Sequence, residues 1–202
     1  MIKSFFLAFL SLLPAFAQSR FEIDPVHSSA QFAVRHMMIS NVRGEFEKVS
    51  GSVLFDANNL AASKVEATID AASINTRNEK RDGHLKSAEF FDVANYPTLS
   101  FKSTKIEKKG DNYVMTGDLT IHGVTKQTAF TVEGPARPVK DPKGIQHTGA
   151  SATTTINRKD FGLVWNKAMD SGGAVVGDEV RITLDVEMAQ KPDQPVGLPA
   201  TN

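Results

Sequence analysis

Apolar and polar residues alternate along most of the chain, which is the pattern of β-strands that bury one face and expose the other. The segment 179–188 shows the pattern most clearly, because every second residue from Val180 to Met188 is apolar and the residues between them are charged or threonine. The same alternation predicts further strands around Ala30 to Val34 and over 44–56, 64–70, 98–106, 112–121, 124–134 and 149–157. The pattern thus predicts about eight strands.

The connections between these strands are mostly short turns that contain Gly, Asn or Asp, such as 108–112 and 121–125. Short turns favour an antiparallel meander. The chain has no helical segment long enough to cover a flat sheet. Closure removes the exposed sides of such a sheet, so we expect an all-β fold, an eight-stranded antiparallel up-and-down barrel. A sandwich of two sheets is the alternative.

An eight-stranded barrel is either filled by side chains or left open for one small ligand. The segment 149–157 carries only Gly, Ala, Ser and Thr before Ile156, and small residues along one wall leave space. We therefore expect a cavity, with a core filled by large side chains as the alternative. The residues expected to line it are Phe32, Phe46, Phe101, Leu119, Phe130, Trp165 and Ile182.

The segment 75–97 does not alternate and is too long for a hairpin connection. We expect one or two short helical turns in it, with Asn75 or Thr76 as N-cap and Gly83 as an interruption. The adjacent Phe90 and Phe91 are expected to cover apolar surface of the barrel.

Polar residues of this excursion and of a later motif are candidates for contacts with a ligand. Asp82 and His84 either touch a polar head group or fix the loop by bonding its backbone. Arg158 and Asp160 form a predicted charge pair at a strand end, which either fixes a loop or orients a head group at the barrel mouth. No second reactive group at a defined distance is evident, so catalysis is not expected.

The first residues resemble an export signal. Lys3 precedes an apolar run of about 14 residues that ends in Ala15-Phe16-Ala17, and a membrane-spanning helix needs ~20 residues. We expect a signal peptide over 1–17 and a periplasmic location, with no integral membrane anchor. The barrel then occupies 18–190, and the Pro-rich, polar segment 191–202 is expected to be a flexible tail.

Composition narrows the classes of partner. The chain has 23 basic and 23 acidic residues, and this balance argues against nucleic acid or an anionic membrane surface. There is no cysteine, so the fold relies on its hydrophobic core instead of disulfides. The five histidines form no recognised ligand motif, and their spread predicts no compact metal site.

Four segments together resemble the YceI-like family of exported bacterial lipid-binding proteins: IDPVHSSAQFAVRHMMISNVRGEFEKVSGSVLFD, RDGHLKSAEFFDVANYPTLSF, LTIHGVTK and NRKDFGLVW. The similarity covers residues 21 to about 189. It implies a lipocalin-like barrel whose apolar cavity holds a polyisoprenoid, such as an isoprenoid quinone or its precursor. Fatty-acid-like amphiphiles are the ligands of some relatives.

The predicted function is the non-covalent binding, carriage or sequestration of a long-chain isoprenoid lipid or similar amphiphile, with no cofactor besides this ligand. An enzyme that acts on a small amphiphile through Asp82, His84 and Lys86 is one alternative. A stress-response structural barrel with a filled core is another. Whether two barrels pair as a homodimer is left open.

Overall fold

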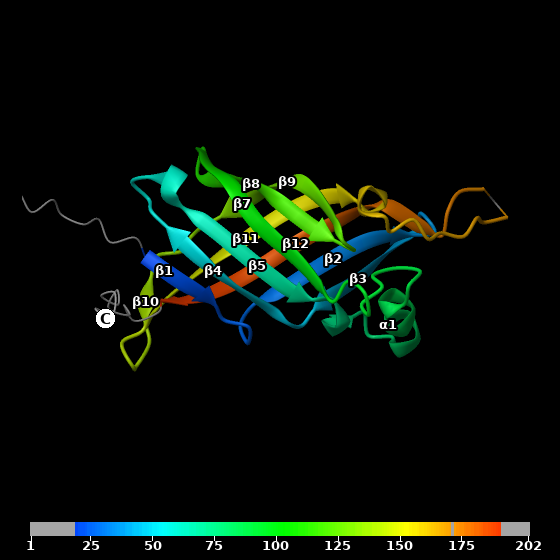
Figure 1. The fold of residues 1–202 in the computed structure, drawn as a ribbon, viewed down its shortest axis with the longest axis horizontal. Helices are drawn as coiled ribbons and strands as arrows, with labels where there is room; N and C mark the ends of the chain where they lie inside the picture. Colours follow the sequence, from blue (N-terminus) through cyan, green and yellow to red (C-terminus); the bar gives the residue numbers. More distant parts are fainter. Residues whose placement is uncertain (1–18, 171, 191–202) are drawn as a thin grey trace, which may run out of the picture.

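The computed structural model describes residues 19–170 and 172–190, which form one sheet that closes on itself (Figure 1). The predicted signal peptide and the predicted tail lie outside the described residues. The strands are β1 (Ser19–Ile23), β2 (Ser29–His36), β3 (Ser40–Phe46), β4 (Val49–Phe55), β5 (Lys64–Asp70), β6 (Ile74–Asn75), β7 (Thr98–Lys109), β8 (Asn112–Ile121), β9 (Val124–Glu133), β10 (Val139–Lys140), β11 (Gln146–Asn157) and β12 (Val176–Gln190). The helix α1 spans Glu79–Lys86, and three short 3₁₀ turns span Leu60–Ala62 (η1), Ala71–Ser73 (η2) and Arg158–Phe161 (η3).

Three pairs of short strands each act as one long, interrupted strand. β12 pairs with β1 near its carboxyl end and with β2 along its first part, while β4 pairs with β1 and β3 with β2. In the same way β4 pairs with β5, and β3 with β6. With β1–β2, β3–β4 and β5–β6 each counted as one strand, and with the two-residue β10 beside β11 left out, eight antiparallel strands follow one another around the barrel. β12 closes it between β11 and the β1–β2 pair. The predicted up-and-down barrel is confirmed, and the sandwich alternative is wrong.

The prediction of one unbroken strand over 44–56 is wrong, because Glu47 and Lys48 leave the strand ladder. Their amides bond instead to the neighbouring turn η2: Glu47 N donates to Ser73 O at 3.2 Å, and Lys48 N donates to Ser73 Oγ at 3.2 Å. The turn η2 is itself capped by Asp70, whose carboxylate accepts from Ala72 N at 2.9 Å. The interruptions in neighbouring strands therefore lie beside one another.

The excursion after β6 forms one helix at one end of the barrel, opposite the end that carries β10 (Figure 1). Its N-cap is Asn78, whose side chain accepts from Arg81 N at 3.0 Å, so the predicted caps Asn75 and Thr76 are wrong. Gly83 lies inside α1 instead of interrupting it. Nothing lies within 4 Å of the position that a Cβ at Gly83 would occupy, so this side of the helix packs against no other element.

The barrel interior is built from the apolar face that alternation predicted, with its best-buried residues spread over most strands. Phe90 is 7% exposed, and the Phe91 ring packs edge-on against Phe46 with centroids 5.6 Å apart. Phe90 and Phe91 thus cover apolar surface as predicted. Within residues 19–170 and 172–190, no helix is long and apolar enough to span a membrane.

Candidate ligand-binding cavity

Two adjoining cavities occupy the interior of the barrel. The first, here the helix-end cavity, has a volume of about 280 Å³ and is lined in part by Leu85 of α1 and by Phe46 and Trp165. The second, here the β10-end cavity, has a volume of about 390 Å³ and is bounded by 135–138 at the opposite end. Both volumes are near or within the range of about 300–1,000 Å³ typical of small-molecule sites. The interior is therefore not filled by side chains.

Five aliphatic side chains are common to the walls of both cavities. They are Ile69, Leu99, Ile121, Ile182 and Leu184. Because the same side chains line both spaces, the cavities adjoin within one apolar interior.

All seven residues predicted to line a cavity do so. Phe32, Phe46 and Trp165 line the helix-end cavity; Phe101, Leu119 and Phe130 line the β10-end cavity; Ile182 lines both. Of the small residues of β11, Ala150 and Ala152 form part of the β10-end wall. The structure places these side chains on the cavity walls, and their contact with a ligand remains a prediction.

An aromatic cluster covers the helix-end cavity. The His84 ring packs edge-on against Phe90 and Trp165, with centroids 5.0 and 4.9 Å away, and Phe90 and Trp165 lie 5.1 Å apart. His84 Nε2 also lies 2.6 Å from a carboxylate oxygen of Glu89. His84 is thereby held in one orientation with its ring on the cavity wall.

Asp82 does not line either cavity. Its carboxylate accepts from the backbone amide of Thr76 at 2.9 Å and also from the Thr76 hydroxyl. Arg81, by contrast, lines the helix-end cavity and donates through Nε to Thr76 Oγ1 and through Nη2 to Thr76 O, both at 2.7 Å. Of the two roles considered for Asp82, the geometry provides the loop-fixing one.

Arg158 lies on the wall of the helix-end cavity and is only 3% exposed. Its guanidinium donates to the backbone carbonyls of Leu163, Trp165 (2.9 Å) and Gly177 (2.8 Å), so it joins the 158–165 segment to β12. Burial lowers the pKa of the Arg158 guanidinium, and the Asp178 charge opposes this shift. An arginine remains cationic in proteins, so these carbonyls receive charge-assisted hydrogen bonds.

The predicted charge pair between Arg158 and Asp160 is wrong. Within the turn η3 Arg158 turns inward, whereas Asp160 is exposed and lines neither cavity. The ionic partner of Arg158 is Asp178, with Nη2 and Oδ1 3.3 Å apart. Lys159 binds the other oxygen of Asp178 at 2.9 Å and holds the pKa of this carboxyl below its usual value, with Arg158 adding to the effect.

Sequence reasoning missed part of the polar lining of the helix-end cavity. Arg35 and His36, at the end of β2, and Arg81 join His84 and Arg158 there. In the part of the chain that the structure describes, no aspartate or glutamate lines this cavity. The one available signal for Arg35 and His36 is their position at the end of an alternating segment, and alternation alone does not say which barrel end a strand reaches.

Comparison with known proteins agrees with this architecture. The model of the YceI-like domain matches residues 21–188. The UPF0312 protein SA2479 of Staphylococcus aureus (strain N315) is 37% identical over 171 residues, which is 85% of this chain and 98% of the relative.

Solved structures share the fold. BcnA of Burkholderia cenocepacia is 25% identical with a TM-score of 0.69, over 82% of this chain and 98% of that chain. The YceI protein of Campylobacter jejuni is 33% identical with a TM-score of 0.64, over 78% and 90%. A polyisoprenoid binding domain from Saccharophagus degradans is 15% identical with a TM-score of 0.61, over 87% and 100%, which is a likeness of fold alone. With a family model that spans the barrel from its first strand to its last, the chain belongs to the YceI-like family.

Proposed function

We propose that this protein binds a long-chain isoprenoid lipid non-covalently along the barrel axis. The observation that carries the proposal is the pair of apolar cavities, whose walls share five aliphatic side chains. Rotamer changes of these side chains would join the cavities into one channel suited to a long, thin tail. Each methylene that leaves water contributes about 0.8 kcal/mol. A relative by fold is described as a polyisoprenoid binding domain, which supports the same class of ligand here.

The polar lining favours a head group that accepts hydrogen bonds, placed at the helix end. Arg35 and His36 supply donors there, together with the ring nitrogen of His84 that does not face Glu89 and the part of the Arg81 guanidinium that does not bind Thr76. An isoprenoid quinone presents carbonyl oxygens, which are acceptors only, and this matches the donors. Arg158 has a structural role instead, because its donors are engaged by the backbone carbonyls of Trp165 and Gly177. It thereby holds these two segments together.

Binding is favoured over catalysis by what surrounds His84. Its ring is packed against two aromatic residues and paired with Glu89. Among the described residues that line the helix-end cavity there is no Ser, Thr, Asp, Glu or Lys to act with it as nucleophile, acid or base. We place this binding in the periplasm, on the strength of the leader-like first residues, as carriage or sequestration of the lipid.

The test is recovery and uptake of the ligand. The purified mature chain is examined by native mass spectrometry and organic extraction, and the delipidated protein is titrated with decylubiquinone while fluorescence of Trp165, the only tryptophan, is followed. We expect a co-purified isoprenoid lipid and saturable quenching. No lipid together with no uptake of the analogue contradicts the proposal. A His84→Ala variant separates the enzyme alternative, since a carrier shows at most an altered affinity and no conversion of the ligand.

A matched pair of variants locates the binding in the barrel. Ala152→Phe places a ring in the β10-end cavity, and Thr155→Phe places the same ring on the exposed side of the same strand. We expect the first variant to lose most of the quenching and the second to keep it. Equal binding by both variants would indicate that the ligand binds outside the barrel.

A further inference from the structure

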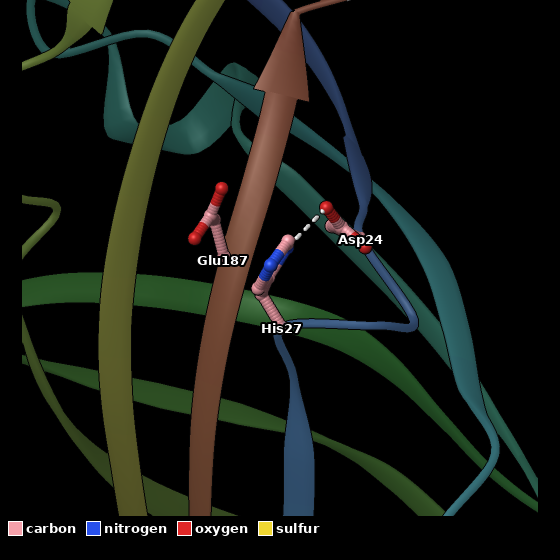
Figure 2. Close-up of side chains that lie close together, drawn as sticks. All are labelled: Asp24, His27 and Glu187. Atoms are coloured by element: carbon pink, nitrogen blue, oxygen red, sulfur yellow. Dashed lines mark hydrogen bonds and ion pairs between the residues drawn. The ribbon is translucent and has the colours of Figure 1, made fainter.

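Three groups of metal-ligating type meet on the outer wall of the barrel, away from the cavities. Asp24 and His27 come from the turn between β1 and β2, and Glu187 comes from β12 (Figure 2). One ligand atom from each lies within 4.8 Å of the other two. Glu187 is distant in sequence from the other two residues, which is why the spacing of histidines along the chain indicated no compact site.

Backbone hydrogen bonds fix the two segments to each other. Asp24 N donates to Glu187 O at 2.9 Å. Ser28 Oγ donates to the same carbonyl at 3.3 Å and accepts from Glu187 N at 3.1 Å. Within the turn, Val26 N donates to Asp24 Oδ1 at 2.8 Å. The three side chains therefore project from a framework that is set before any ion arrives, and a preorganised site loses little entropy on binding.

The charges of this group are balanced only by histidine. His27 Nδ1 lies 2.8 Å from Asp24 Oδ2. In the described chain, every ion pair made by Asp24 or Glu187 is with a histidine and none is with lysine or arginine. Two carboxylates and an imidazole thus converge without a permanent cation between them.

A second histidine supports the carboxylate of Glu187 from the other side. His147 Nδ1 lies 3.0 Å from Glu187 Oε1, so this histidine does not engage Oε2. His147 Nε2 is buried without a hydrogen bond among the described residues, and the nearest charged atom, Asp141 Oδ2, is 3.5 Å away. Carboxylates that bind metals are commonly hydrogen-bonded in this way by an outer partner, which orients them.

We propose that Asp24, His27 and Glu187 bind one divalent transition-metal ion, and that Zn²⁺ is the ion that fits best. One imidazole nitrogen and two carboxylate oxygens are ligands that zinc accepts at about 2.0–2.2 Å. Ca²⁺ and Mg²⁺ prefer an all-oxygen set, which the imidazole does not provide. The His27 side chain is 62% exposed, so the fourth position of the ion is open to water. The site is separate from the lipid cavities and does not depend on their occupant.

The direct test is a titration of the metal-free full chain with Zn²⁺ by isothermal titration calorimetry, confirmed by competition with a chelating dye. We expect saturation at one ion per chain and a higher melting temperature in the presence of the ion. His27→Ala and Glu187→Gln, both on the outer wall, are expected to abolish saturable binding and the thermal shift together. His147→Gln is expected to weaken binding about tenfold, the usual cost of losing an outer partner.

Two control variants separate this site from general binding by surface histidines and carboxylates. His122→Asn removes a histidine in the turn between β8 and β9, and Glu66→Gln removes a surface carboxylate that pairs with Lys102. Both are expected to bind Zn²⁺ as the unmodified chain does. Absence of one-to-one binding in the unmodified chain overturns the proposal, as does equal binding by His27→Ala or loss of binding in His122→Asn.

Discussion

Replacement of Arg158 by methionine is expected to destabilise the helix end of the barrel. Methionine fills a similar space and carries no donor, so the variant removes the hydrogen bonds that the guanidinium makes to the carbonyls of Leu163, Trp165 and Gly177. These carbonyls belong to two segments at the helix end of the barrel, 158–165 and the start of β12. The guanidinium of Arg158 donates hydrogen bonds to carbonyls of both segments.

The size of the effect follows from how deeply each acceptor lies. The contact with the Leu163 carbonyl is buried, and an unpaired buried acceptor costs about 2 kcal/mol. The contacts with Trp165 and Gly177 are part-buried, so water restores some of their hydrogen bonding and each costs about 1 kcal/mol. We expect Arg158→Met to lower the free energy of unfolding by about 4 kcal/mol, which corresponds to a melting temperature about 10 °C lower for a chain of this size.

The assay is urea unfolding followed by Trp165 fluorescence, which reports on a residue whose own carbonyl binds Arg158. Lys159→Met is the matched control, because Lys159 pairs with the same Asp178 from an exposed position, 46% accessible, and exposed pairs contribute less than about 1 kcal/mol. A loss below about 1 kcal/mol in Arg158→Met, with unchanged tryptophan emission, would refute the role assigned to this arginine.

Further predictions concern glycine and acid. Gly83→Ala is expected to raise the free energy of unfolding by about 0.5–1 kcal/mol, because alanine favours the helix and meets nothing. Gly117→Ala is expected to lower the free energy of unfolding by about 1–3 kcal/mol, because the new Cβ would lie 2.4 Å from a carbonyl of β7 and 2.5 Å from the Phe101 ring. Thermal unfolding of both variants checks that one is stabilised and the other destabilised. The pKa of Asp178 is lowered in the fold, chiefly by Lys159, so its contribution to stability is present above its ordinary pKa and is lost as the pH falls through the lower, folded value. The free energy of unfolding, measured from about pH 5 to pH 2, should therefore fall more steeply with decreasing pH in the unmodified chain than in Asp178→Asn. Parallel curves for the two proteins would contradict this.

Alternation predicted the strands and closure of the barrel because the inward face of each strand is apolar wherever the ladder is regular. The interruption at Glu47 and Lys48 also left a trace in the sequence. Phe46 and Val49 are both buried although they are three residues apart, so the alternation changes phase between β3 and β4. A strict count of two residues per repeat would have divided the predicted strand there.

The polar parts of the molecule were harder to predict, because their partners carry no sequence signature. Arg158 binds backbone carbonyls, which any residue supplies, and its ionic partner Asp178 lies beyond a long connection. His27 meets Glu187 only because the first and last strands are neighbours in the closed barrel. The apolar lining that the strands contribute was predictable from period two, which decides which side chains face inward, whereas Leu85, Phe90 and Trp165 line the helix-end cavity from outside the strands.

The position of β12 also determines how the chain behaves when its last strand is missing. β12 alone joins β11 to the β1–β2 pair. A chain that stops before Val176 would leave the facing rows of backbone amides and carbonyls on both sides without partners, and such edges pair readily with other chains. A truncation within this fifteen-residue strand is therefore expected to produce aggregates instead of a smaller closed barrel.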